Sequence, residues 1–168
     1  MPRYHVLGAV FPLMLCLAAF VPPTHALAAE PAPVLLHNGE RFLRMGNLGF
    51  AKANYDKLIA NYEGTPEAAE AHGDLGVIAA RRGDDDLAIA EYEKALAIDG
   101  YPLAHFNLGQ ALLRKLDHGG DASLAARARE HFLAFAAYLE SGRPRPAILT
   151  YRLDEVRTKL TAALKRLK

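Results

Sequence analysis

The chain has 168 residues and a nearly balanced charge, with 20 Lys and Arg against 19 Asp and Glu. This length favours one domain with at most an appendage. The balanced charge excludes recruitment of nucleic acid or membranes by an overall electrostatic field. Hydrophobic residues make up 51% of the sequence, which excludes a wholly disordered chain. Alanine, the strongest helix former, occurs 31 times, so we expect an all-α protein.

The N-terminal segment, residues 1–28, has the pattern of a secretory signal peptide. One arginine precedes a mostly apolar run over residues 6–21, and Ala26-Leu27-Ala28 fits the small-residue cleavage motif. We therefore expect export, most simply to the bacterial periplasm, with a mature chain that starts at Ala29. Secretion and an uncleaved membrane anchor are the alternatives. The apolar run is shorter than the ~20 residues that span a bilayer, which argues against the anchor.

The body of the chain contains a repeat with an offset of 33 residues. Residues 69–100 read AEAHGDLGVIAARRGDDDLAIAEYEKALAIDG, and the next copy begins PLAHFNLGQALLRKL at Pro102. Self-similarity at a fixed period of this size is typical of solenoids built from helical pairs.

The repeated residues resemble the signature of the tetratricopeptide repeat (TPR) family. The residues at its signature positions are Leu75, Gly76, Gly83, Ala88, Tyr92, Ala95 and Leu96. Gly83 would end the first helix of the pair, and the acidic run 84–86 offers N-caps to the second. The sequence departs from the family at the first aromatic position, where His72 and His105 replace Trp. We expect these two histidines to line the core and not to bind a ligand.

The resemblance implies an α-solenoid of about three helix-turn-helix repeats within residues 29–142. We place the repeats at about 32–65, 69–102 and 102–141, the last with an insertion near 117–123. The second helix of the third repeat is expected over residues 128–139.

The C-terminal segment, residues 143–168, predicts a basic amphipathic helix. It carries a net charge of +6 against −6 for residues 29–142, and its apolar residues recur at every third or fourth position. A basic helix of this kind can bind anionic lipid or nucleic acid. We prefer a capping helix that covers the open end of the solenoid, because its apolar stripe must be buried.

In the TPR family the first helices of the pairs line a concave groove, which binds a peptide or a partner protein. Arg44, Arg81 and Arg114 take the same position in the three first helices. They either bind acidic groups, because the guanidinium fork matches carboxylates, or cap helix C-termini. Phe106 and Leu113 would hold an apolar side chain or pack against the capping helix. The predicted groove residues are Arg44, Val77, Arg81, Phe106, Asn107, Gln110, Leu113 and Arg114.

No pattern of catalytic residues is present in the sequence. It contains no HExxH, CxxCH, phosphate-binding glycine loop or G-x-S-x-G motif. The single cysteine excludes a cysteine-built zinc site, and we expect neither cofactor nor metal. The sequence thus predicts a non-enzymatic scaffold that binds a protein or peptide and no nucleic acid, for example in envelope or secretion-complex assembly. A membrane-associated adaptor, held by an uncleaved N-terminus or the basic helix, is the alternative.

Overall fold

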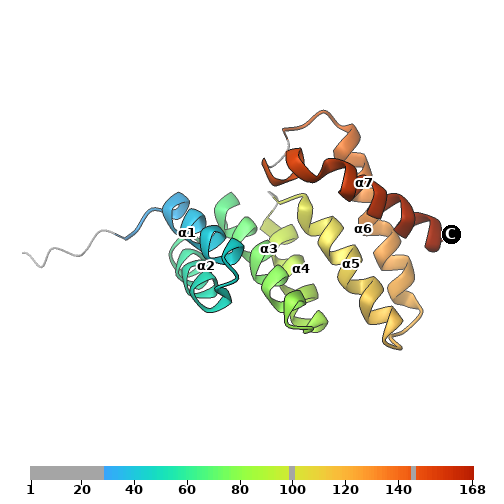
Figure 1. Cartoon of the computed structure of the whole chain (residues 1–168), viewed down its shortest axis with the longest axis horizontal. Coiled ribbons are helices and arrows are strands. Elements are labelled where there is room, and N and C mark those ends of the chain that lie inside the picture. The colour runs from blue at the N-terminus through green and yellow to red at the C-terminus, as the bar shows by residue number, and fades with distance from the viewer. Residues whose placement is uncertain (1–28, 99–100, 145–146) are drawn as a thin grey trace, which may run out of the picture.

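The computed structural model describes residues 29–98, 101–144 and 147–168, without the side chains of residues 147, 148, 150 and 151. The predicted signal peptide lies outside the described residues. Helices are the only regular elements within these ranges (Figure 1). The helices are α1 (Ala32–Arg44), α2 (Leu48–Tyr62), α3 (Pro66–Arg81), α4 (Asp85–Ile98), α5 (Leu103–Asp117), α6 (Ser123–Glu140) and α7 (Ala147–Arg166).

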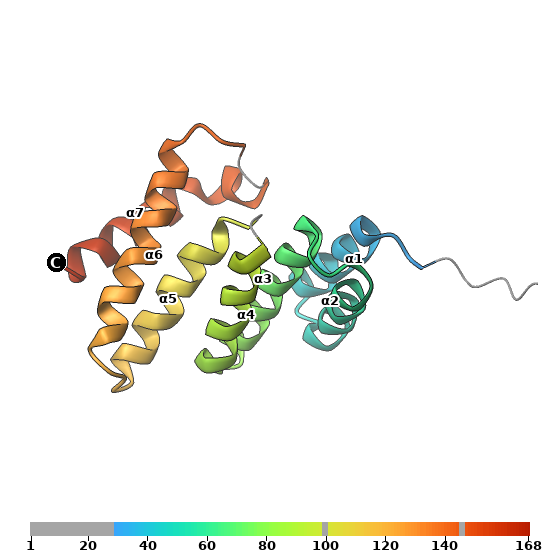
Figure 2. The same ribbon diagram turned by 180° about the vertical axis from the view of Figure 1, so that it is seen from behind.

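The helices stack as antiparallel pairs, which confirms the predicted all-α solenoid (Figures 1 and 2). Each pair packs closely within itself: α1 with α2, α3 with α4, and α5 with α6. The first helices also contact one another, α1 with α3 and α3 with α5, while α2 packs on α3 and α4 on α5. We call the side formed by α1, α3 and α5 the inner face. α7 crosses the last pair, in front of α6 in Figure 1 and behind it in Figure 2.

Local signals in the sequence set the ends of the helices. Thr65 caps α3, because its Oγ1 accepts a hydrogen bond from the Ala68 amide at 3.2 Å. Asp84 Oδ1 accepts from the Leu87 amide at 3.0 Å, as expected for the acidic run at the start of α4. Gly83 has a φ of 80°, a left-handed conformation that glycine adopts without strain and that ends α3.

Glycines on the first helices receive aromatic rings from the second helices of the same pairs. A Cβ added to Gly76 would lie 2.5 Å from the Tyr92 ring, and one added to Gly109 would lie 2.8 Å from the Phe132 ring. Gly39 faces the Tyr55 ring in the same way. Each ring packs on the glycine of its own pair, and the Tyr55 hydroxyl also reaches Asp74 in the next pair.

The third pair differs from the other two in its second helix. α6 begins at Ser123, five residues before the expected start at residue 128, and is four residues longer than α4. Most of the inserted sequence therefore extends the helix by about one turn. A short connection that contains Gly119, with a φ of 90°, joins α5 to α6.

The apolar side of α7 is buried against the end of the solenoid. Leu149, Val156 and Leu160 are at most 8% exposed and belong to the same core cluster as Phe132 and Phe135 of α6. This packing is the role that the sequence predicts for a capping helix.

Candidate functional site

A cavity of about 230 Å³ opens on the inner face, between the first helices and α7. We call it the inner-face cavity. It combines side chains from α1, α3, α5 and α7 with one from the α4–α5 connection. Its lining residues are Leu43, Arg44, Asp74, Val77, Arg81, Tyr101, Leu103, Phe106, Asn107, Gln110, Leu149, Arg152, Glu155, Val156 and Lys159.

Six of the eight predicted groove residues line this cavity, and two do not. The six are Arg44, Val77, Arg81, Phe106, Asn107 and Gln110. Leu113 is partly buried against the core cluster, and Arg114 is turned toward α4. The predicted groove residues of α1, α3 and the first half of α5 therefore lie together around one cavity. The two at the end of α5 face other parts of the protein.

The three equivalent arginines have three different surroundings. Arg44 is 64% exposed and lies 3.8 Å from Glu40. Arg81 donates from Nη1 to the Leu43 carbonyl at 3.2 Å and so caps the C-terminus of α1. Arg114 donates from Nε to Asp85 Oδ1 at 2.9 Å. The capping interpretation therefore holds for Arg81, although the helix that it caps belongs to the preceding pair.

Phe106 forms part of the floor of the cavity and of the core at once. It is 4% exposed, and its ring centroid lies 5.3 Å from that of Phe135. Leu149 and Val156 of α7 are also buried beside it. Because these side chains pack against one another in the core, the apolar floor is a fixed surface that a ligand can contact.

α7 supplies a wall of the cavity, and none of its residues is among the predicted groove residues. Arg152 and Lys159 both pair with Glu155, at 2.9 and 2.7 Å. The basic character of the C-terminal segment was visible in the sequence. The position of these side chains could not be predicted from the sequence, because it depends on the path of α7 across the stack.

The charge of the inner face changes along the solenoid. Four cationic side chains line the cavity against two carboxyl groups, those of Asp74 and Glu155. Burial raises the pKa of Asp74 to about 6, although the Tyr55 hydroxyl donates a hydrogen bond of 2.6 Å to it and opposes that rise. The cavity is therefore positively charged overall.

An acidic groove lies next to this cavity, between α1 and α3. Glu40, Glu67 and Glu70 line it together with Leu36 and other side chains. Burial, followed by the charges of Asp74, Glu40 and Glu67, raises the pKa of Glu70 to about 7. A segment bound along the inner face would thus meet acidic groups near α1 and basic groups near α7.

The remaining titratable residues singled out in the sequence have structural partners. The buried His72 lies with its Nδ1 2.7 Å from Glu91 Oε2. His105 Nδ1 lies 3.0 Å from His131 Nδ1. Asp85 and Asp86 pair with Arg114 and Lys115 of α5. Within the described residues, no group of three or more His, Cys, Asp or Glu could hold a metal ion.

A tetratricopeptide repeat family model matches residues 36–102. The match begins within α1 and ends before α5, so it covers the first two helical pairs. These pairs contain the glycine–aromatic contacts of Gly39 and Gly76. No curated protein matches the chain significantly. Repeats of the matched type are typical of non-catalytic scaffolds for protein–protein interaction.

Proposed function

We propose that this chain is an exported interaction scaffold that holds a segment of a partner protein on its inner face. The observation that carries the proposal is the inner-face cavity, which three first helices and α7 build together. A site assembled from four helices is positioned by the whole solenoid. It presents a fixed apolar floor beside polar and charged walls, a composition typical of ligand-binding pockets.

Two amides in the cavity are suited to binding a peptide backbone. Asn107 and Gln110 lie one turn apart on α5, both are partly exposed, and neither side chain has a hydrogen-bond partner among the described residues. Each carboxamide offers donors and an acceptor. They can therefore pair with the N–H and C=O groups of an extended segment while its side chains contact the apolar floor.

Site-specific photo-crosslinking tests whether the partner lies in this cavity. A photoreactive residue at Gln110 should capture the partner, whereas one at the exposed Ala126 of α6 should not. Equal capture at both positions would place the partner elsewhere.

A double variant tests the two amides directly. We prefer Asn107→Ala with Gln110→Ala over a change at Arg81, because Arg81 also caps α1. The double variant should lower affinity about tenfold or more, through loss of buried hydrogen bonds, with unchanged circular dichroism.

Export rests on the signal-like N-terminus. α1 begins at Ala32, so cleavage before Ala29 would leave every described helix intact. No described helix is long and apolar enough to cross a membrane. Cell fractionation with mass analysis should find the protein in the periplasmic pool with Ala29 as its first residue. An exported chain that still starts at Met1 would contradict cleavage and favour the membrane-associated adaptor.

A further inference from the structure

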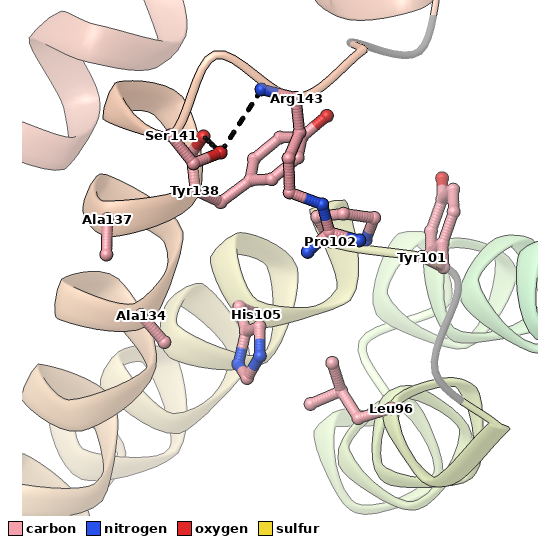
Figure 3. Close-up of a pocket in the computed structure, with 9 residues that line it drawn as sticks. All are labelled: Leu96, Tyr101, Pro102, His105, Ala134, Ala137, Tyr138, Ser141 and Arg143. Atoms are coloured by element: carbon pink, nitrogen blue, oxygen red, sulfur yellow. Dashed lines mark hydrogen bonds between the residues drawn. The ribbon is translucent and has the colours of Figure 1, made fainter.

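A second pocket, of about 310 Å³, lies among α4, α5 and α6 (Figure 3). It shares one lining residue, Tyr101, with the inner-face cavity. Its lining residues are Leu96, Tyr101, Pro102, His105, Ala134, Ala137, Tyr138, Ser141 and Arg143. The volume falls at the lower end of the range for small-molecule sites, roughly 300–1,000 Å³.

One side of the pocket is apolar because of the small residues on α6. Ala134 and Ala137 form one wall, and Leu96 of α4 and Pro102 at the start of α5 face them across the space (Figure 3). Two alanines on this side of α6 leave room that larger side chains would fill. This side of the pocket can therefore take a hydrocarbon group.

The polar end of the pocket is held in place by the segment that follows α6. The Tyr138 hydroxyl donates to the Pro144 carbonyl at 2.6 Å, and the Ser141 hydroxyl donates to the Tyr138 carbonyl at 2.7 Å. The Arg143 amide donates to Ser141 Oγ at 3.3 Å. These bonds fix the backbone from which the Arg143 side chain reaches across the pocket toward Pro102 (Figure 3).

Arg143 has no anionic partner in the described part of the protein. Its guanidinium lies 5.8 Å from the centre of the Tyr138 ring and forms no ion pair there. No Asp or Glu lines the pocket within the described residues. A guanidinium above an apolar space without a carboxylate is complementary to an anion, and its planar fork matches a carboxylate best.

We propose that this pocket binds a small organic carboxylate, with the carboxylate on Arg143 and the hydrocarbon body between Leu96 and the two alanines of α6. Ser141, His105, Tyr101 and Tyr138 also line the pocket and carry polar groups. This site adjoins the inner-face cavity proposed to hold a protein segment, and Tyr101 lines both.

A titration of the purified protein with 3-phenylpropionate, followed by amide NMR shifts, tests the proposal. The expected result is a saturable shift of the Ala134, Ala137 and Arg143 amides. The titration should extend to about 10 mM, because a single charge-assisted contact supports roughly millimolar affinity. The neutral analogue 3-phenylpropanamide should bind at least tenfold more weakly. No saturable shift, or equal binding of the amide, would overturn the proposal.

Two variants, each with a matched control, test separately the charge of Arg143 and the space beside Ala134. Arg143→Gln should weaken binding at least tenfold, whereas Arg129→Gln, the same change at an exposed position on α6, should leave it unchanged. Ala134→Leu fills the pocket without altering charge and should abolish the shifts. Ala126→Leu, exposed on the same helix, should not. Full affinity in either Arg143→Gln or Ala134→Leu would overturn the proposed site.

Discussion

Gly76 lies inside α3, where its backbone conformation would suit any residue, but the Tyr92 ring leaves no room for a side chain. A Cβ there would lie 2.5 Å from a ring carbon in a side chain that is 2% exposed. Gly76→Ala should therefore lower the free energy of unfolding by about 1–3 kcal/mol through overpacking. Chemical denaturation monitored by circular dichroism measures the change.

Gly49 provides the matched control for this substitution. It also lies in a helix, α2, but nothing approaches its missing Cβ within 4 Å. Gly49→Ala should raise stability by up to about 0.5 kcal/mol, because alanine is the better helix former and Gly49 lies in the first turn of α2. If both alanine variants changed stability in the same direction, the ring contact would not explain Gly76.

Glu70 makes the stability of the protein depend on pH near neutrality. Burial and the neighbouring carboxylates raise its pKa to about 7 in the folded state, against 4.5 for the free side chain. Between these values the folded state holds a proton that the unfolded state releases, so stability falls as pH rises through this window. Glu70→Gln should thus raise the melting temperature at pH 8 and leave it nearly unchanged at pH 4.5.

The control for this pH effect is Glu63→Gln, at an exposed position beyond the end of α2. It removes the same charge without the buried environment, so its effect on melting should be small at both pH values. A Glu70→Gln variant with the same gain at pH 4.5 as at pH 8 would show that its effect does not come from ionisation.

At the scale of the element, α7 stabilises the protein through its apolar stripe. Leu160 is 6% exposed and lies in the core cluster that extends from α3 to α7. Leu160→Ala should lower stability by about 2–5 kcal/mol, the usual cost of such a truncation in a core. Thr161→Ala, exposed on the same helix, should have little effect. A thermal midpoint unchanged in Leu160→Ala would mean that α7 is not docked in solution.

The helical pairs could be predicted from sequence because their determinants are local. Gly83 and Asp84 mark the turn between α3 and α4, and the spacing from Gly76 to Tyr92 repeats in the first pair. The start of α6 could not be placed, because the inserted residues can extend either a loop or a helix. The periodicity of α7 indicated an apolar side that caps the end of the solenoid, and the structure shows this packing.

The register of the repeats predicts which residues of the candidate site share a face of the solenoid. It does not predict the side chains and carbonyls that each of them contacts. Register placed Val77, Arg81 and Asn107 on one face, and the inner-face cavity contains them. Register also suggested that Arg81 and Arg114 would act alike. Their partners differ, a backbone carbonyl for one and the Asp85 carboxylate for the other, because different residues of the preceding pair face each position.

At the scale of the whole molecule, the core divides into two clusters that meet at α3. One cluster joins α1, α2 and α3 around Leu35, Tyr55 and Leu58, and the other extends from α3 to α7. Val77 packs against both. In a solenoid, stability is carried by each unit and its contacts with the next, so the terminal unit opens at the lowest cost. We therefore expect α1 and α2 to open before the remainder, which α7 covers at its other end.

Hydrogen exchange on a variant of the larger cluster tests this order of opening. Leu112 of α5 is fully buried, and Leu112→Ala should lower the exchange free energy of the α5 and α6 amides by about 2–5 kcal/mol. Amides of α1 and α2 should keep their exchange free energy, because their opening leaves Leu112 packed. Leu58→Ala in α2 should instead lower both sets, since every larger opening includes the first pair. A uniform decrease across all helices in Leu112→Ala would show that the solenoid unfolds as one unit.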